Sequence, residues 1–190
     1  MKALLAAALI GTGLAGTSTE GFAQRAERER TVTVGGAPMY PSKTIVENAV
    51  NSKDHTTLVA AVKAAGLAET LSGPGPFTVF APTNAAFGKL PAGTVETLVK
   101  PENKQRLTGI LTYHVVPGRL TAADLARQVR EGNGTARLKT VAGGELTVRD
   151  AGGGKLEITD AKGGKSSVTI ADVLQSNGVI HVVDTVLQPS

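Results

Sequence analysis

The sequence predicts an α+β fold in a single domain. Apolar residues between positions 43 and 131 recur mainly at spacings of three and four, which is typical of helices. After Gly132-Asn133-Gly134 the spacing changes to two, with glycine-rich breaks between short runs, as in antiparallel strands. A chain of 190 residues that is 41% hydrophobic and 19% charged has the size and composition of one globular domain with tails.

The first residues have the pattern of a secretory signal peptide. Lys2 precedes the apolar run Ala3–Ile10, and Gly21-Phe22-Ala23 supplies the small residues of a cleavage site before Gln24. We therefore expect a signal peptide over residues 1–23, with an uncleaved anchor as the alternative. No later apolar stretch is long enough to cross a bilayer, so the mature protein is expected to be secreted, either extracellular or periplasmic.

Residues 24–42 are predicted to be a flexible leader. Charges alternate in the first part, and Gly35-Gly36 and two prolines follow. Met39 and Tyr40 are candidates for docking on the edge of the domain. The domain itself is expected to cover residues 43–190.

The helical part of the domain contains five predicted helical segments and two short strands. The first strand, Phe77–Ala81, is apolar and lies between two prolines, so it should be buried. The second, Tyr113–Val116, follows a helix and ends at Pro117. The helical segments are expected around Ile45–Val50, Leu58–Ala65, Phe87, Val95–Val99 and Leu107–Leu111. A further helix should begin at Thr121, where the sequence resembles a capping box.

The second half is predicted to be an antiparallel meander with one solvated face. Its breaks contain glycine pairs or triplets, which favour hairpin turns. The last strand, Val179–Leu187, is apolar on both faces and should lie centrally. The expected inward-facing pairs are Ala136/Leu138, Leu146/Val148, Leu156/Ile158 and Val168/Ile170.

The residue inventory gives no support for catalysis, a metal site or a cofactor. The chain has no cysteine, which removes disulfides and thiol chemistry. Its three histidines have no second ligand at metal-binding spacing, and His181 and Asp184 should face opposite sides of a strand. A G-x-G-x-x-G pattern at residues 11–16 lies inside the signal peptide, so it is not a dinucleotide site. We expect no enzyme activity.

The charge and the aromatic content also limit the possible partners. A net charge of +4 permits weak attraction to anionic surfaces. With no Trp, two Tyr and four Phe, the chain offers few platforms for stacking bases. Nucleic-acid binding is therefore not expected.

Three stretches together resemble the fasciclin domain family. They are Gly75–Phe87, Leu111–Gly118 and Ser176–Asp184, which match the first signature, the central Tyr-His segment and the second signature of that family. The resemblance covers roughly Ile45 to Pro189, and it is strongest to bacterial secreted members with one domain. It implies a wedge of mainly antiparallel β-strands with packed helices.

The resemblance also implies a role in adhesion at cell surfaces and in extracellular matrix. In animal members, integrin binding is attributed to the Tyr-His segment and to an Asp-Ile pair before the second signature. The matching residues here are Tyr113, His114, Asp172 and Val173. Val173 replaces the isoleucine and bacteria have no integrins, so only a general adhesive surface carries over, for a cell-surface or matrix protein or an anionic polysaccharide.

Two functions remain open at this point. The first is a secreted, non-enzymatic adhesion or matrix-interaction module, which calls for an exposed basic or apolar patch. The alternative is a periplasmic carrier or sensor that binds a small apolar or lipid-like ligand, which calls for an enclosed cavity. Either way, Tyr113 and His114 can be structural residues rather than contacts, and a buried histidine then needs a hydrogen-bond partner.

Overall fold

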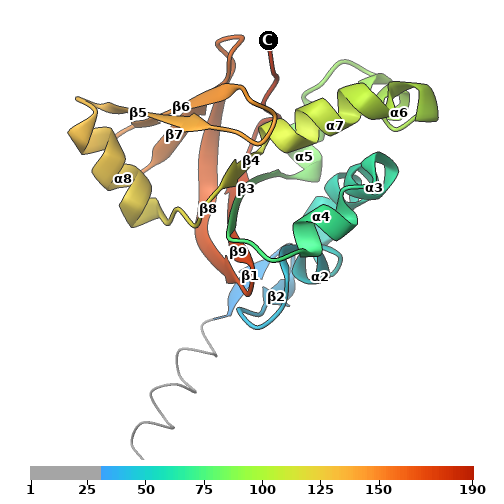
Figure 1. The fold of residues 1–190 in the computed structure, drawn as a ribbon, viewed down its shortest axis with the longest axis horizontal. Helices are drawn as coiled ribbons and strands as arrows, with labels where there is room; N and C mark the ends of the chain where they lie inside the picture. The colour runs from blue at the N-terminus through green and yellow to red at the C-terminus, as the bar shows by residue number, and fades with distance from the viewer. Residues whose placement is uncertain (1–30) are drawn as a thin grey trace, which may run out of the picture.

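A computed structural model describes residues 31–190 of the chain. The expected signal peptide and the first part of the leader lie outside the described residues. Figure 1 shows two halves on either side of the long strand β8 (Lys165–Gln175): a small sheet covered by one helix, and a group of helices packed against the central strands. The α+β class is confirmed. Between residues 31 and 190, no helix is long and apolar enough to cross a membrane.

Local sequence signals explain where α2 and α8 begin. Thr44 and Glu47 form a capping box at the start of α2, and Thr121 and Asp124 form the one expected at α8. The helices are α2 (Ile45–Ala49), α3 (Thr56–Ala65), α4 (Ala68–Ser72), α5 (Asn84–Gly88), α6 (Thr94–Leu98), α7 (Lys104–Tyr113) and α8 (Ala122–Glu131). Short 3₁₀ turns, η1 (Lys53–His55) and η2 (Pro101–Asn103), lead into α3 and α7.

Seven strands form the main sheet in the order β4-β3-β9-β8-β7-β6-β5. The meander from β5 to β9 is antiparallel as predicted, whereas β3 and β9 pair in parallel at its centre. The sheet curls so far that its two edge strands come together. The Val141 amide, just after β5, donates to the Val115 carbonyl of β4 over 2.8 Å. The remaining strands are β3 (Phe77–Pro82), β4 (Val115–Pro117), β5 (Thr135–Lys139), β6 (Glu145–Asp150), β7 (Leu156–Thr159) and β9 (Gly178–Val183).

Two hydrophobic cores lie on either side of the central strands. One core joins the helices α2 to α7 to one face of β3 and β9. The other fills the curled sheet, where α8 contributes Leu125 and Val129 and the meander contributes three of the four predicted inward pairs. The fourth pair, Val168 and Ile170, is only half-buried, because β8 shifts its register against β9 on both sides of Ile170.

The structure differs from the expected flexible leader over its described part. Strands β1 (Val32–Val34) and β2 (Ala37–Met39) form a hairpin joined by Gly35-Gly36, whose positive φ angles of 59° and 76° suit a tight two-residue turn. Val34 and Met39 are 2% and 3% exposed and belong to the helical core. The folded unit therefore includes residues N-terminal to Lys43.

Candidate functional site

Tyr113 is a structural residue at the end of α7. Its side chain is fully buried, and its hydroxyl donates to the Glu145 carbonyl at 2.7 Å and accepts from the Ala161 amide at 2.9 Å. A Cβ added at Gly144 would lie 2.7 Å from the tyrosine ring, so this turn approaches the ring closely. Burial raises the pKa of Tyr113. The phenol thus joins α7 to two turns of the meander.

His114 is the C-cap of α7, so the strand predicted from Tyr113 begins two residues later, at Val115. Its Nδ1 lies 2.8 Å from the Ile110 carbonyl, and its Nε2 accepts from the Leu187 amide at 2.9 Å. These partners place the proton of a neutral imidazole on Nδ1. Burial lowers the pKa of His114 to about 4, against opposing contributions from the Ile110 carbonyl and Asp160.

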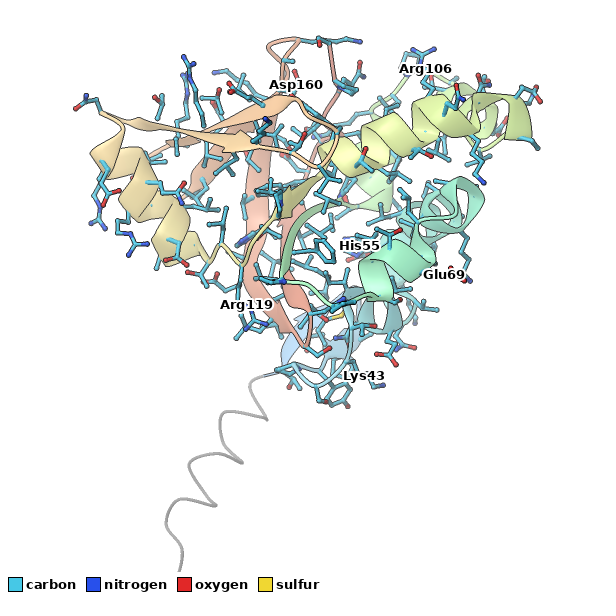
Figure 2. The ribbon with its side chains drawn as sticks, viewed as in Figure 1. Lys43, His55, Glu69, Arg106, Arg119 and Asp160 are labelled. Atoms are coloured by element: carbon cyan, nitrogen blue, oxygen red, sulfur yellow. The ribbon has the colours of Figure 1, made fainter. Side chains whose placement is uncertain are left out.

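Asp160 connects the same region to the C-terminal segment. It is 8% exposed; its Oδ1 accepts from the Lys162 and Gly164 amides and its Oδ2 from the Gln188 amide. Figure 2 shows Asp160 at the same end of the molecule as Arg106 of α7. Tyr113 and His114 therefore help to hold α7, the β7–β8 turn and residues 186–190 together.

Asp172 and Val173 lie on the irregular part of β8. Asp172 is half-buried with φ of +56°, and its Oδ1 accepts from the Ala122 amide at 2.7 Å, at the start of α8. Its own amide donates to Nδ1 of His181 over 3.4 Å, while Nε2 of His181 lies 2.8 Å from the Leu120 carbonyl. His181 is thus a hydrogen-bonded core histidine, and burial lowers its pKa. Val173 is 1% exposed.

The four predicted site residues do not form one surface. His114 and Val173 line the same small, apolar cavity, whereas the Tyr113 ring packs into the other core and Asp172 contacts α8. Among the four, Asp172 alone retains more than slight exposure. The structure thus gives three of them buried positions.

The cavity of about 50 Å³ lies among the helices, with the β1–β2 hairpin on one side. Its lining is almost wholly apolar, and the exceptions include His55, which is 3% exposed. Nδ1 of His55 is 2.9 Å from the Ser52 hydroxyl, whereas its Nε2 makes no hydrogen bond. The Ala81 carbonyl is nevertheless close enough to act toward a higher pKa of His55. Burial outweighs that carbonyl and lowers the pKa of His55.

An open groove of about 660 Å³ lies on the other side of His114. It runs between the α5–α6 connection, helix α7 and the C-terminal segment, and His114 and Leu111 line both the groove and the cavity. The floor is apolar, and Arg106 and Lys162 stand exposed at the groove. None of the described side chains that line it is acidic.

Sequence reasoning missed the groove because four distant segments form it. One local signal points to it: Gly109 lies inside α7, three residues after Arg106 and next to Ile110, and all three line the groove. Elsewhere in residues 31–190, no three histidine or acidic side chains gather in a way that could hold a metal ion.

Comparison with known proteins agrees with this architecture. The family description "Fasciclin domain" matches residues 53–189. The chain is 49% identical over 182 residues to protein sll1483 of Synechocystis sp., covering 96% of this chain and 93% of that protein. It is 38% identical over 146 residues to the immunogenic protein MPB70 of Mycobacterium bovis, covering 74% and 66% respectively.

Two further matches come from animals. The transforming growth factor-beta-induced protein ig-h3 of Sus scrofa is 36% identical over 149 residues, which cover 78% of this chain and 20% of that protein. A solved FAS1 domain pair from the insect cell adhesion molecule fasciclin I has a TM-score of 0.68 at 22% identity, and the match covers 82% of this chain and 57% of that one. At this identity, the match to the insect domain pair shows a shared fold.

Proposed function

Because this chain belongs to the fasciclin domain family, we propose that it is a secreted, non-enzymatic module that attaches to a cell surface or matrix. The observation that carries the proposal is the open groove beside His114. Its volume of about 660 Å³ is within the range of roughly 300–1,000 Å³ found for binding pockets, and its apolar floor and basic side chains could hold a partner.

The four predicted site residues have different roles in this proposal. Tyr113, His114 and Val173 are buried and act by holding the backbone around the groove and the cavity. Asp172 is half-buried, so its carboxylate is the one that could touch a partner directly. Secretion rests on the signal-peptide pattern at residues 1–23.

Attachment can be tested with beads that carry the purified exported chain. The beads should be retained on cells of the source organism, on matrix protein or on anionic polysaccharide. Retention should fall as salt rises, since the net charge of +4 acts through exposed groups that are screened beyond about 8 Å at physiological ionic strength. Retention no higher than that of beads coated with an unrelated protein of similar charge would overturn the proposal.

Export is a separate part of the same proposal. The intact mass of the protein from the extracytoplasmic fraction should correspond to a chain that starts at Gln24. A full-length species that remains with the cytoplasm or the membrane would contradict secretion.

A second candidate function is a carrier for a small apolar ligand. The observation that favours it is the apolar cavity in which Nε2 of His55 makes no hydrogen bond. A cavity of about 50 Å³ is much smaller than a pocket for a lipid, so its ligand would be a molecule of a few heavy atoms unless the β1–β2 hairpin moves. Native mass spectrometry of the chain from its own compartment tests this, because a carrier would retain its ligand.

A further inference from the structure

We propose that the groove between the α5–α6 connection, α7 and residues 186–190 binds an acidic, partly apolar peptide segment of a partner protein. This inference rests on the proposed adhesive function and names the chemistry of the partner. Three features of the groove support it: a helical glycine with nothing near its Cβ position, an excess of basic over acidic side chains, and two polar side chains that are already hydrogen-bonded.

Gly109 exposes the backbone of α7 to the groove. It lies in the interior of the helix, where glycine is among the poorest residues, yet a Cβ built there would meet nothing within 4 Å. By contrast, a Cβ at Gly75 or Gly178 would lie 2.0 Å from a backbone oxygen, so internal packing explains those glycines. Packing within the described chain does not explain Gly109. An occupant that lies close against the helix would explain it.

The charge around Gly109 favours an anionic occupant. Arg106 precedes it by three residues on the same face of α7, and Lys162 faces the groove from the β7–β8 turn. Neither side chain takes part in an ion pair among the described residues. The described lining has two basic side chains and no acidic one, and its one carboxylate is that of the backbone at Ser190. The balance is therefore positive, and carboxylates of a partner would be attracted to Arg106 and Lys162.

The polar lining favours a peptide over a sugar chain. The Thr97 hydroxyl already donates to the Gly93 carbonyl at 2.7 Å, and Asn103 Nδ2 donates to the Thr97 carbonyl at 2.8 Å. These two side chains therefore have less capacity left for the many hydroxyls of a polysaccharide. The apolar floor instead suits the side chains of a protein segment; it includes Phe87, Leu98, Leu107, Ile110 and Val186.

The test measures binding of defined peptides to the purified exported chain. An octapeptide that alternates leucine with aspartate is the main probe; a version with lysine for aspartate, a version with serine for leucine and a heparin fragment are the comparisons. We expect the leucine-aspartate peptide to bind at least tenfold more tightly than the other probes, with NMR shifts centred on the amides of Gly109 and Ile110. Equal affinity for the lysine version, or tighter binding of heparin at the groove, would overturn the proposal.

Variants of Gly109 and Arg106 sharpen this test. Gly109→Leu fills the groove, so peptide affinity should fall at least tenfold while the melting temperature stays equal or rises. Gly88→Leu is the matched control, since Gly88 is an exposed helical glycine outside the groove with nothing within 4 Å of its Cβ position. Arg106→Glu should also lower affinity at least tenfold, and Arg137→Glu on β5 should leave it within twofold. Unchanged affinity in Gly109→Leu would overturn the inference.

The bead assay separates the two proposals. Attachment that Gly109→Leu abolishes supports both the adhesive function and the groove. Attachment that persists in Gly109→Leu leaves the function standing and overturns the groove as its site. If the unmodified chain does not attach to any surface, the function itself fails.

Discussion

Hydrogen bonds to distant segments give Tyr113 and His114, two of the residues first identified from the sequence, a structural role. Tyr113 and His114 each connect α7 to segments far away in the chain, through the Glu145 carbonyl and the Leu187 amide. The sequence could suggest that both are structural, because each lies in an apolar run. It could not supply their partners, because these lie 32 and 73 residues further along the chain, at the start of β6 and in the C-terminal segment.

The Tyr113 hydroxyl gives the first prediction. Tyr113→Phe keeps the ring but leaves the Glu145 carbonyl and the Ala161 amide without their partner, so we expect the free energy of unfolding to fall by about 1–3 kcal/mol. Urea unfolding followed by circular dichroism measures this. Tyr40→Phe is the control, since Tyr40 is 40% exposed, and it should change stability by less than about 0.5 kcal/mol.

Asp172 gives a prediction that separates folding from binding. Asp172→Ala removes the acceptor for the Ala122 amide and puts alanine at φ of +56°, so it should cost about 2 kcal/mol. Asp172→Asn keeps an oxygen acceptor and a residue that tolerates this backbone region, so its melting temperature should stay near that of the parent.

The asparagine variant is therefore the one to use in the attachment assay. Loss of bead attachment in Asp172→Asn, with the melting temperature kept, would show that the charge contacts a partner. Unchanged attachment would remove Asp172 from the contact surface.

At the scale of elements, local patterns predicted the meander and the helices other than α4. Capping residues and changes of hydrophobic period are local signals, so the start of α8 and three inward pairs of the meander were found from them. The parallel pairing of β3 with β9 was not found, because it joins segments about 100 residues apart and no local pattern records it. The β1–β2 hairpin was missed although Gly35-Gly36 between alternating apolar residues is a hairpin signal.

The hairpin gives a prediction at this scale. Met39→Ala should lower the free energy of unfolding by about 2–5 kcal/mol, because Met39 is 3% exposed in the helical core. Thr33→Ala, on the exposed face of β1, should change it by less than about 0.5 kcal/mol. Chemical denaturation of the two variants compares them; equal, negligible effects would mean that the hairpin does not contribute to the fold in solution.

For the molecule as a whole, three buried histidines predict lower stability in acid. Burial lowers the pKa of His55, His114 and His181 below the usual value of 6.5. The unfolded chain then binds more protons than the folded chain as pH falls below about 6.5, so stability is lost in that range. For His114, with a folded pKa of about 4, the loss amounts to about 3 kcal/mol by pH 4.

Urea midpoints at pH 7.5, 5.5 and 4.5 measure this loss. His114→Gln should start less stable at pH 7.5 but show a shallower dependence on pH, since it removes the histidine with the pKa of about 4. A midpoint that does not fall between pH 7.5 and 4.5 would contradict the neutral, buried state of these side chains.

The position of β9 has a consequence for mechanical load. In Figure 1 the β1–β2 hairpin lies at the bottom of the molecule and the C-terminus at the top, and β9 runs between them with β3 on one side and β8 on the other. A pull between the hairpin and the C-terminus would slide β9 along its neighbours, so the hydrogen bonds of both ladders would share the force and break together rather than one after another. A module that holds a surface through one end while its chain is pulled from the other would thus be loaded along its most resistant direction.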